Sequence, residues 1–301
     1  ESWQAWFCAT ALELVERLSL DGFRFDAPTY NNFANWSPQR RRRASASSTG
    51  AVALFGQLRA ELKARHPEVL MFTEPSGVVL RESMDMNYNY DELWLVPALT
   101  SGGGRPWAVR NAAQLAAWFD ERDATLPEAA LTCHHLDSHD SFWWPEPGRK
   151  WRREQIGPAA TRALTWCLAL SGGPFMMFTG GETGMEQDLA RTLELRRERP
   201  ELAGGAADFS AARPDVESLY AVLRHHDRNG VLVLVNLSPR PAAAACELGG
   251  GWRATSNEEL YSAGAGSATV LAPTARVGTT SGGTPQVEID PYGMALIEVG
   301  R

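Results

Sequence analysis

Several features that define large protein classes are missing from the sequence. No run of 18 apolar, uncharged residues occurs, so we predict no membrane-spanning helix. The chain carries 29 Lys and Arg against 36 Asp and Glu, a net charge of −7. Nucleic-acid-binding domains are typically basic, so this balance argues against a nucleic-acid partner. The glycine pairs at 172–173 and 180–181 lack the GxGxxG and GxxxxGK patterns of phosphate-binding loops.

Cysteine is also scarce. Cys8, Cys133, Cys167 and Cys246 lie far apart, and no two of them form a CxxC motif. This spacing predicts four free thiols rather than a zinc site, a redox dithiol or a disulfide framework. Unpaired thiols slightly favour a cytoplasmic location, which nothing else in the sequence specifies. The first residues also lack the basic segment of a signal peptide.

What is present is an ordinary globular composition, with 44% hydrophobic and 22% charged residues in a chain of 301. Apolar residues at helical spacing predict helices over residues 3–18, 51–65, 111–122, 158–170 and 187–198. Short apolar segments between these helices predict strands at 20–26, 69–74, 83–88, 129–137 and 174–178. This alternation indicates a parallel α/β architecture.

The texture of the sequence changes after about residue 200. Segments at 218–226, 230–238 and 287–299 predict strands separated by Gly, Pro and Asn, and no helical pattern occurs in 239–286. The ~100 residues of this part suffice for an antiparallel sandwich. We therefore predict two domains, an α/β domain over residues 1–202 and an all-β sandwich over residues 203–301.

Three carboxylates stand at the ends of predicted strands. Asp26 and Glu74 each close a strand directly, and Asp140 comes shortly after the strand that ends in HHLD. Any one of them alone is more often a helix cap or an ion-pair partner. Side chains at the carboxyl ends of parallel barrel strands converge on one face, however, and the active site lies there. Three acids at strand ends therefore favour a catalytic cluster.

Arg24 lies two residues before Asp26, so their side chains face the same side of the strand. A guanidinium beside a carboxylate keeps it ionised and oriented, as a nucleophile requires. Glu74 follows Phe72 and Thr73, and we expect for it a less polar setting that suits a proton donor. One ionised carboxylate and one protonated carboxyl about 5–5.5 Å apart are what a retaining glycosidase needs.

The segments GFRFDAP, FTEPSG and LDSHD resemble the second, third and fourth signature regions of the α-amylase family, glycoside hydrolase family 13. GGPFMMFTGGETG (172–184) is similar to the strand-8 loop of that family, and LELRRERPEL (193–202) to its last barrel helix. SLYAVLR, VLVLVNLS and DPYGMALIEV resemble its C-terminal β domain. The resemblance covers nearly the whole chain. It implies an α/β fold in which a partial (β/α)8 TIM barrel, strands 4–8, precedes an all-β sandwich.

The resemblance implies that the protein is a retaining glycoside hydrolase that acts on α-glucans, which are α-1,4-linked oligosaccharides or polysaccharides of glucose. The reaction would pass through a covalent glycosyl-enzyme. The resemblance implies that Asp26 is the nucleophile, Glu74 the general acid/base and Asp140 the transition-state stabiliser. Arg24 and His139 would contact the sugar in the −1 subsite. Two alternatives stay open, an α-glucan transglycosylase or maltosyltransferase and a non-catalytic α-amylase-like binding subunit.

The resemblance also implies that residue 1 lies inside a longer chain. The first three barrel strands of the family, its first signature region and the domain inserted after strand 3 have no counterpart in the sequence. We therefore expect a missing N-terminal barrel half to complete the natural protein, and these residues alone to be inactive. The reaction requires no cofactor, and a structural Ca²⁺ is compatible with the missing part.

Other residues have two interpretations. His134 and His135 could be metal ligands, but no third ligand accompanies them at metal-ligand spacing. A core or substrate-lining role is therefore favoured, and we predict no metal site. Trp143 follows Asp140 on an expected loop, where it could stack on a sugar ring or pack within the loop. The run Arg40–Arg43 predicts a solvated surface loop.

Overall fold

The computed structural model describes residues 3–28, 50–74, 78–88, 92, 96–97, 99–100, 109–127, 130–142, 150–256, 260–263 and 275–301. Contacts divide the chain into two compact units. The first unit comprises Glu1–Tyr90 and Thr125–Cys133, and the second comprises Asp91–Ala124 and His134–Arg301. None of the helices in these ranges is long and apolar enough to cross a membrane.

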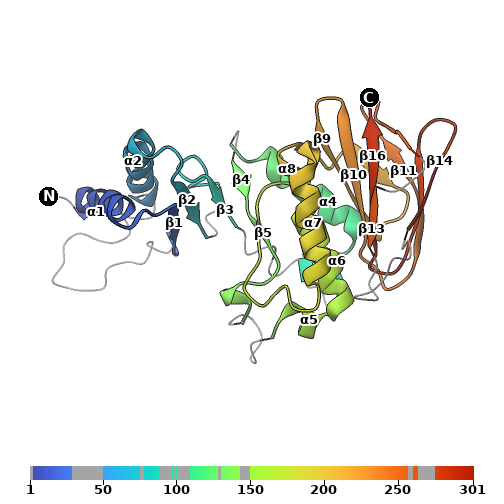
Figure 1. Ribbon diagram of the computed structural model, residues 1–301, viewed down its shortest axis with the longest axis horizontal. Coiled ribbons are helices and arrows are strands. Elements are labelled where there is room, and N and C mark those ends of the chain that lie inside the picture. The colour runs from blue at the N-terminus through green and yellow to red at the C-terminus, as the bar shows by residue number, and fades with distance from the viewer. Residues whose placement is uncertain are drawn as a thin grey trace. The chain divides into compact units, whose positions relative to one another are not determined.

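The first unit is built on a four-stranded parallel sheet with the order β1-β2-β3-β4 (Figure 1). Its elements, in chain order, are α1 (Trp3–Leu18), β1 (Gly22–Phe25), α2 (Gly50–Arg65), β2 (Leu70–Thr73), β3 (Met86–Asn87) and β4 (Leu131–Thr132). These positions confirm the helices predicted at 3–18 and 51–65 and the strands predicted near 20–26, 69–74 and 83–88.

Helices α1 and α2 pack on one face of this sheet. Met71 of β2 is fully buried in the same apolar cluster as Leu12 of α1 and Leu58 of α2. Because side chains alternate along a strand, Phe72, which follows Met71, faces the other side of the sheet. Gly22 lets β1 and β2 approach closely, since a Cβ atom at this position would lie 2.3 Å from the carbonyl oxygen of Leu70.

The second unit begins with helices and a short parallel strand pair, β5-β6. Its elements up to residue 203 are α4 (Ala112–Ala124), β5 (His134–His135), the 3-10 helix η2 (His139–Phe142), α5 (Arg152–Gln155), α6 (Pro158–Leu170), β6 (Phe175–Met176), α7 (Glu186–Glu198) and α8 (Pro200–Ala203). Helix α6 is mostly apolar and is almost wholly buried, with Trp166 fully buried within it.

The predicted strand at 129–137 is broken in the structure. β4 and β5 are separated by Cys133, and the two short strands belong to different units. The Cys133 N–H donates to the carbonyl oxygen of Asn87 at 2.7 Å, so β4 continues the ladder with β3. The His134 N–H instead donates to the carbonyl oxygen of Pro174 at 2.8 Å, at the start of the pairing with β6.

Two antiparallel sheets follow in the second unit, with the orders β12-β16-β10-β9-β7 and β14-β15-β11-β8, and β13 also pairs with β16 (Figure 1). The strands are β7 (Ala206–Asp208), β8 (Ala212–Pro214), β9 (Leu219–His226), β10 (Asn229–Asn236), β11 (Ala242–Leu248), β12 (Arg253–Ala254), β13 (Tyr261–Ala263), β14 (Ala275–Thr279), β15 (Pro285–Ile289) and β16 (Met294–Gly300). The segment predicted as a strand at 287–299 contains two strands, because the chain turns between Ile289 and Met294.

Strand β10 explains why residues 230–235 form an unbroken apolar run. Leu232 and Leu234 pack into the cluster between the two sheets together with Ile289. Val231 and Val233 face the other way, into the cluster that contains Trp166 of α6. A strand covered on both faces is apolar at every position, and this places one side of the sandwich directly against the helical part of the same unit.

A buried arginine joins these layers. Arg224 of β9 is only 1% exposed and donates to the carbonyl oxygens of Leu170 at 3.0 Å and Gly205 at 2.8 Å. Burial, together with the charge of Arg196, lowers the pKa of Arg224 to about 10. The side chain therefore stays charged at neutral pH and fixes the end of α6 and the segment after α8 to the sheet.

Candidate active site

The candidate site lies at the carboxyl ends of β1, β2 and β3. The last residues of these three strands pair in one row: Phe25, Thr73 and Asn87. The residues that follow them along the chain are Asp26, Glu74 and Tyr88. Because the strands are parallel and in register, these three side chains occupy neighbouring positions at the edge of the sheet. Two of them are the acids that the sequence predicts for the first two catalytic roles.

Arg24 connects the two acids. Its Nη1 atom donates to Oδ1 of Asp26, and its Nη2 atom donates to Oε2 of Glu74 at 2.5 Å. The carboxylate of Asp26 is 77% exposed, whereas that of Glu74 is 6% exposed. One acid is therefore open to a reactant and the other is enclosed beside it.

The guanidinium of Arg24 remains charged in this setting. Burial opposes the charge, but the hydrogen bonds to Tyr88 and Asp26 and the charge of Glu74 outweigh burial and raise the pKa of Arg24 above its ordinary value. Its Cζ atom also lies 5.9 Å from the ring centroid of Tyr88, within cation–π range. The site consequently has a permanent positive charge between two carboxylates.

The surroundings of Glu74 are more polar than the sequence predicts. We expected a less polar setting from Phe72 and Thr73, but the carboxylate accepts hydrogen bonds on both oxygens. Oε1 accepts from the Ala27 N–H at 2.5 Å, and Oε2 accepts from the Tyr88 hydroxyl at 3.2 Å as well as from Arg24. Tertiary contacts from two other strands, which neighbouring residues in the sequence do not reveal, provide these donors.

The Ala27 N–H reaches Glu74 through an unusual backbone conformation. Ala27 has a φ of +39°, in the left-handed region that non-glycine residues rarely adopt. Such conformations cost free energy and cluster at functional sites, where the surrounding structure holds them in place. Here the conformation directs a backbone donor from the end of β1 onto the carboxylate at the end of β2.

Asp140 and His139 belong to the second unit and lie on η2. His139 Nε2 is 3.5 Å from Asp140 Oδ1, and the Asp140 N–H donates to Ser138 Oγ at 3.2 Å. Oδ2 of Asp140 is buried and has no hydrogen-bond partner among the described residues. The structure therefore brings Asp26, Glu74 and Arg24 together within the first unit, and the convergence of Asp140 on them stays a prediction. Trp143 lies outside the described residues.

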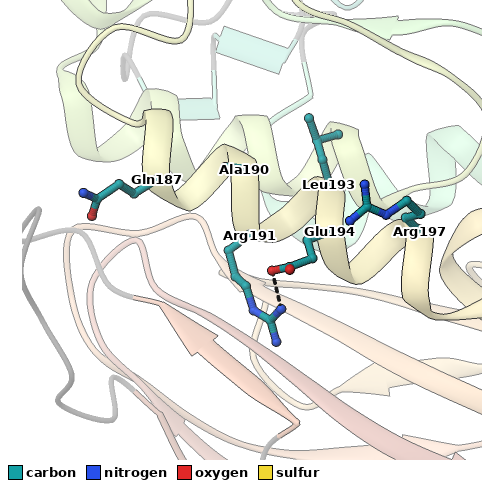
Figure 2. Close-up of a pocket in the computed structure, with 6 residues that line it drawn as sticks. All are labelled: Gln187, Ala190, Arg191, Leu193, Glu194 and Arg197. Carbon is teal, nitrogen blue, oxygen red and sulfur yellow. Dashed lines mark hydrogen bonds and ion pairs between the residues drawn. The ribbon is translucent and has the colours of Figure 1, made fainter.

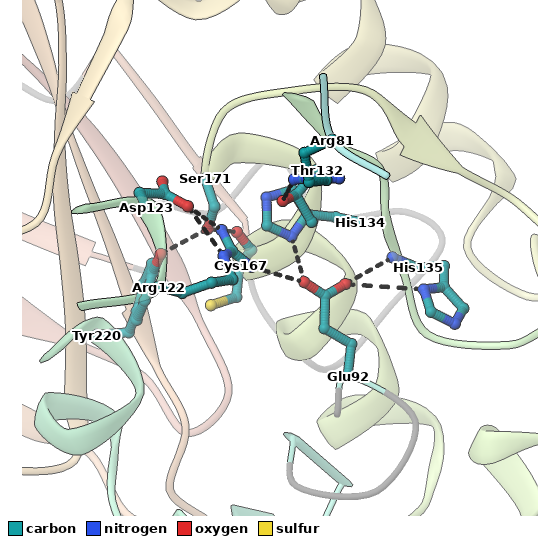
Figure 3. A network of polar contacts seen from close by, with 10 residues as sticks. All are labelled: Arg81, Glu92, Arg122, Asp123, Thr132, His134, His135, Cys167, Ser171 and Tyr220. Carbon is teal, nitrogen blue, oxygen red and sulfur yellow. Dashed lines mark hydrogen bonds and ion pairs between the residues drawn. The ribbon is translucent and has the colours of Figure 1, made fainter. Parts of the chain in front are cut away.

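A second polar cluster, in the second unit, surrounds Glu92. This carboxylate is fully buried, and Figure 3 shows it between His134, His135 and Arg122. His134 Nδ1 lies 2.7 Å from Oε1, the His135 N–H donates to Oε2 at 3.0 Å, and Arg122 Nη1 donates to Oε1 at 3.1 Å. The cluster fixes strand β5, which leads directly into the segment that carries His139 and Asp140.

The charges of this cluster follow from burial and pairing. Burial opposes ionisation of Glu92, but His134 and Arg122 outweigh it and lower the pKa of the carboxyl. Burial lowers the pKa of His135 to about 4, with further lowering from His134 and Arg152 against the opposing charge of Glu92. Both histidines are thus core residues that hold a buried acid, in agreement with the interpretation favoured from the sequence. Glu92 carries no sequence signal that identifies it.

No three His, Cys, Asp or Glu side chains within the described ranges are arranged to hold a metal ion. The four cysteines are free and buried, as the sequence predicts. A surface groove of about 620 Å³ lies along one face of α7. Figure 2 shows its lining residues: Gln187, Ala190, Arg191, Leu193, Glu194 and Arg197. None of them belongs to the candidate active site.

Comparison with known proteins gives a likeness in structure alone. No protein-family model matches the sequence, and no curated protein matches it. A maltogenic α-amylase of Thermotoga neapolitana has 14% identity and a TM-score of 0.69, over 98% of this chain and 65% of its own. A debranching enzyme of Nostoc punctiforme has 16% identity and a TM-score of 0.68, over 99% of this chain and 60% of its own. An α-glucosyl transfer enzyme has 18% identity and a TM-score of 0.66, over 99% of this chain and 68% of its own.

These likenesses extend along nearly the whole chain, which has the fold of the α-amylase family. The chain spans less than two thirds of the length of the amylase and of the debranching enzyme.

Proposed function

We propose that this protein, with its α-amylase fold, is a retaining glycoside hydrolase that acts on α-1,4-linked glucans. The observation that carries the proposal is that one guanidinium, that of Arg24, binds both Asp26 and Glu74. Retaining glycosidases need two carboxyl groups close to each other, about 5–5.5 Å apart. Hydrogen bonds to one shared guanidinium bring the carboxyl groups of Asp26 and Glu74 close together. Strands β1, β2 and β3, the divided strand formed by β4 and β5, and β6 would then be strands 4–8 of a partial (β/α)8 barrel.

In the proposed reaction an Asp26 oxygen attacks the anomeric carbon of a glucosyl unit. The bond from that carbon to the glycosidic oxygen breaks, and Glu74 protonates the leaving oxygen, which yields a covalent glycosyl-enzyme. A water molecule then attacks the same carbon, gives its proton to Glu74 and releases Asp26. Arg24 orients both carboxyl groups through its hydrogen bonds to them.

The other residues proposed for the site belong to the second unit. Asp140 would stabilise the oxocarbenium-like transition state, and the orphaned, buried Oδ2 atom is consistent with a carboxylate that meets a partner in the complex with substrate. His139, which is 55% exposed beside Asp140, would contact the sugar in the −1 subsite, and Trp143 would stack on a sugar ring. The reaction needs no cofactor.

The test uses the full-length protein, with any residues that precede residue 1 in the natural chain. Incubation with maltooligosaccharides, starch, trehalose and sucrose should release reducing sugar from the α-1,4-linked substrates, and proton NMR should detect the α-anomer first. Asp26→Asn and Glu74→Gln should each lower kcat at least about a thousandfold. Glu68→Gln, an exposed carboxylate of the same unit, is the matched control and should leave kcat unchanged. Retained activity in either catalytic variant contradicts the assignment.

Two other functions predict different products. A transglycosylase would convert a single maltooligosaccharide into longer and shorter ones without a matching rise in reducing ends. A non-catalytic binding subunit would retain starch without releasing sugar. Similar structures include both an amylase and an α-glucosyl transfer enzyme, so product analysis separates these functions where fold does not.

A further inference from the structure

Tyr88 follows β3 directly and lies beside Glu74, one row beyond the pairing of Thr73 with Asn87. Its side chain is 1% exposed, and its ring packs edge-on against Phe72 with 5.6 Å between centroids. Its burial and its contact with Phe72 alone would make this tyrosine a core residue. Its hydroxyl, however, lies between two members of the candidate active site.

The direction of the hydrogen bonds at this hydroxyl is fixed by chemistry. Arg24 Nη2 lies 2.7 Å from the Tyr88 oxygen, and a guanidinium can only donate, so the oxygen accepts this bond. The single hydroxyl proton is then available for Glu74 Oε2, at 3.2 Å. Arg24, Tyr88 and Glu74 thus form a closed triangle, since Arg24 also donates directly to Oε2.

This triangle matters because Arg24 is shared. The same guanidinium binds Asp26 through Nη1, so a shift of Arg24 toward Asp26 would release Glu74. The Tyr88 hydroxyl is a second donor to Oε2, and it comes from the end of a different strand. The bond that it accepts from Nη2 of Arg24 keeps the hydroxyl in place beside Oε2.

We infer that Tyr88 is a positioning residue for the acid/base carboxyl, a role that rests on the function proposed above. It holds Oε2 of Glu74 on the buried side, so that the carboxyl group keeps one orientation while Asp26 and Arg24 engage the sugar. Loss of the hydroxyl leaves the ring and its packing in place. The step that suffers is proton delivery to the leaving oxygen.

The variant Tyr88→Phe in the full-length protein tests this role with two substrates. A maltooligosaccharide has a poor leaving group, which needs the proton from Glu74. The fluoride ion of an α-glycosyl fluoride leaves without that protonation. A hydrogen bond to a charged group is worth about tenfold in rate, so kcat/KM for the maltooligosaccharide should fall by about tenfold. For the fluoride it should change less than about twofold, and KM for both should stay near the wild-type value.

Each outcome decides the question. An equal loss on both substrates shows that Tyr88 acts through packing or folding and overturns the inference, as does an unchanged rate on the maltooligosaccharide. Activity on the fluoride also reports that the variant is folded. Tyr292→Phe, in the turn before β16, is the control and should alter neither rate. If Glu74→Gln abolishes activity while Tyr88→Phe does not impair it, the proposed function stands and this inference fails. If Glu74→Gln stays active, both fail.

Discussion

Acid should destabilise the second unit through a single buried histidine. His135 is fully buried beside Glu92, and burial lowers its pKa from 6.5 to about 4, which His134 and Arg152 reinforce and Glu92 opposes. The folded protein therefore keeps this imidazole neutral under conditions in which an unfolded chain would protonate it. Folding and proton uptake then compete at one site.

The size of the effect follows from the two pKa values. Between about pH 6.5 and about pH 4 the unfolded chain binds a proton at His135 that the folded chain does not bind. The free energy of unfolding therefore rises with pH across this window and is lost as the pH falls. A pH of about 5 lies ~1.5 units below the pKa of this histidine in the unfolded chain. Each pH unit is worth ~1.4 kcal/mol, so the free energy of unfolding should be lower by about 2 kcal/mol at this pH.

Urea denaturation followed by circular dichroism measures this loss. We expect the free energy of unfolding of the wild type to fall by about 2 kcal/mol more than that of His135→Gln between about pH 7.5 and about pH 5. His226→Gln, an exposed histidine at the end of β9, is the matched control and should follow the wild type. Parallel pH dependences for the wild type and His135→Gln would refute the reasoning, whatever the absolute stability of the variant.

Three further predictions concern packing, and urea denaturation at neutral pH checks each of them. Gly22→Ala should lower the free energy of unfolding by at least about 2 kcal/mol, because the new Cβ meets backbone, whereas Gly56→Ala, with open space in α2, should raise it by about 0.5–1 kcal/mol. Arg224→Met should lower it by about 3 kcal/mol, because buried carbonyl oxygens lose their donor. Leu232→Ala should lower it by about 2–5 kcal/mol, and exposed Leu193→Ala by less than about 0.5 kcal/mol. Equal effects within either matched pair, or no loss for the arginine, would contradict them.

Sequence periodicity predicted the elements well, because a helix or strand with one buried face imposes its own repeat on the residues. The helix predicted at 158–170 is α6 with the same bounds, and that predicted at 187–198 differs from α7 by one residue. The prediction of a single strand at 129–137 was wrong. Its residues alternate as one strand, but Cys133 and His134 bond to different partner strands, and the division depends on partners far along the chain.

The polar contacts of the site were less predictable for the same reason. The proximity of Arg24 and Asp26 is local, since two residues of one strand share a face. Glu92 instead meets His134 across 42 residues of sequence, and Tyr88 meets Arg24 across 64. No single segment contains a signal for such contacts. Once the strand order is known, however, the neighbours of each strand end can be listed and these residues become candidates.

Register links the fold to the proposed chemistry. Phe25, Thr73 and Asn87 pair in one row, and Asp26, Glu74 and Tyr88 follow them. A slip of one residue in β2 would turn Glu74 from the open face of the sheet to the face that α1 and α2 cover. The acid would then leave Arg24 and Tyr88, although every residue of the site would still be present. The close approach of β1 and β2 at Gly22, where the backbone leaves no room for a side chain, opposes such a slip. The position of the Glu74 carboxyl therefore depends on Gly22, which lies in the neighbouring strand β1 at the opposite end of the pairing with β2, as well as on its own hydrogen bonds.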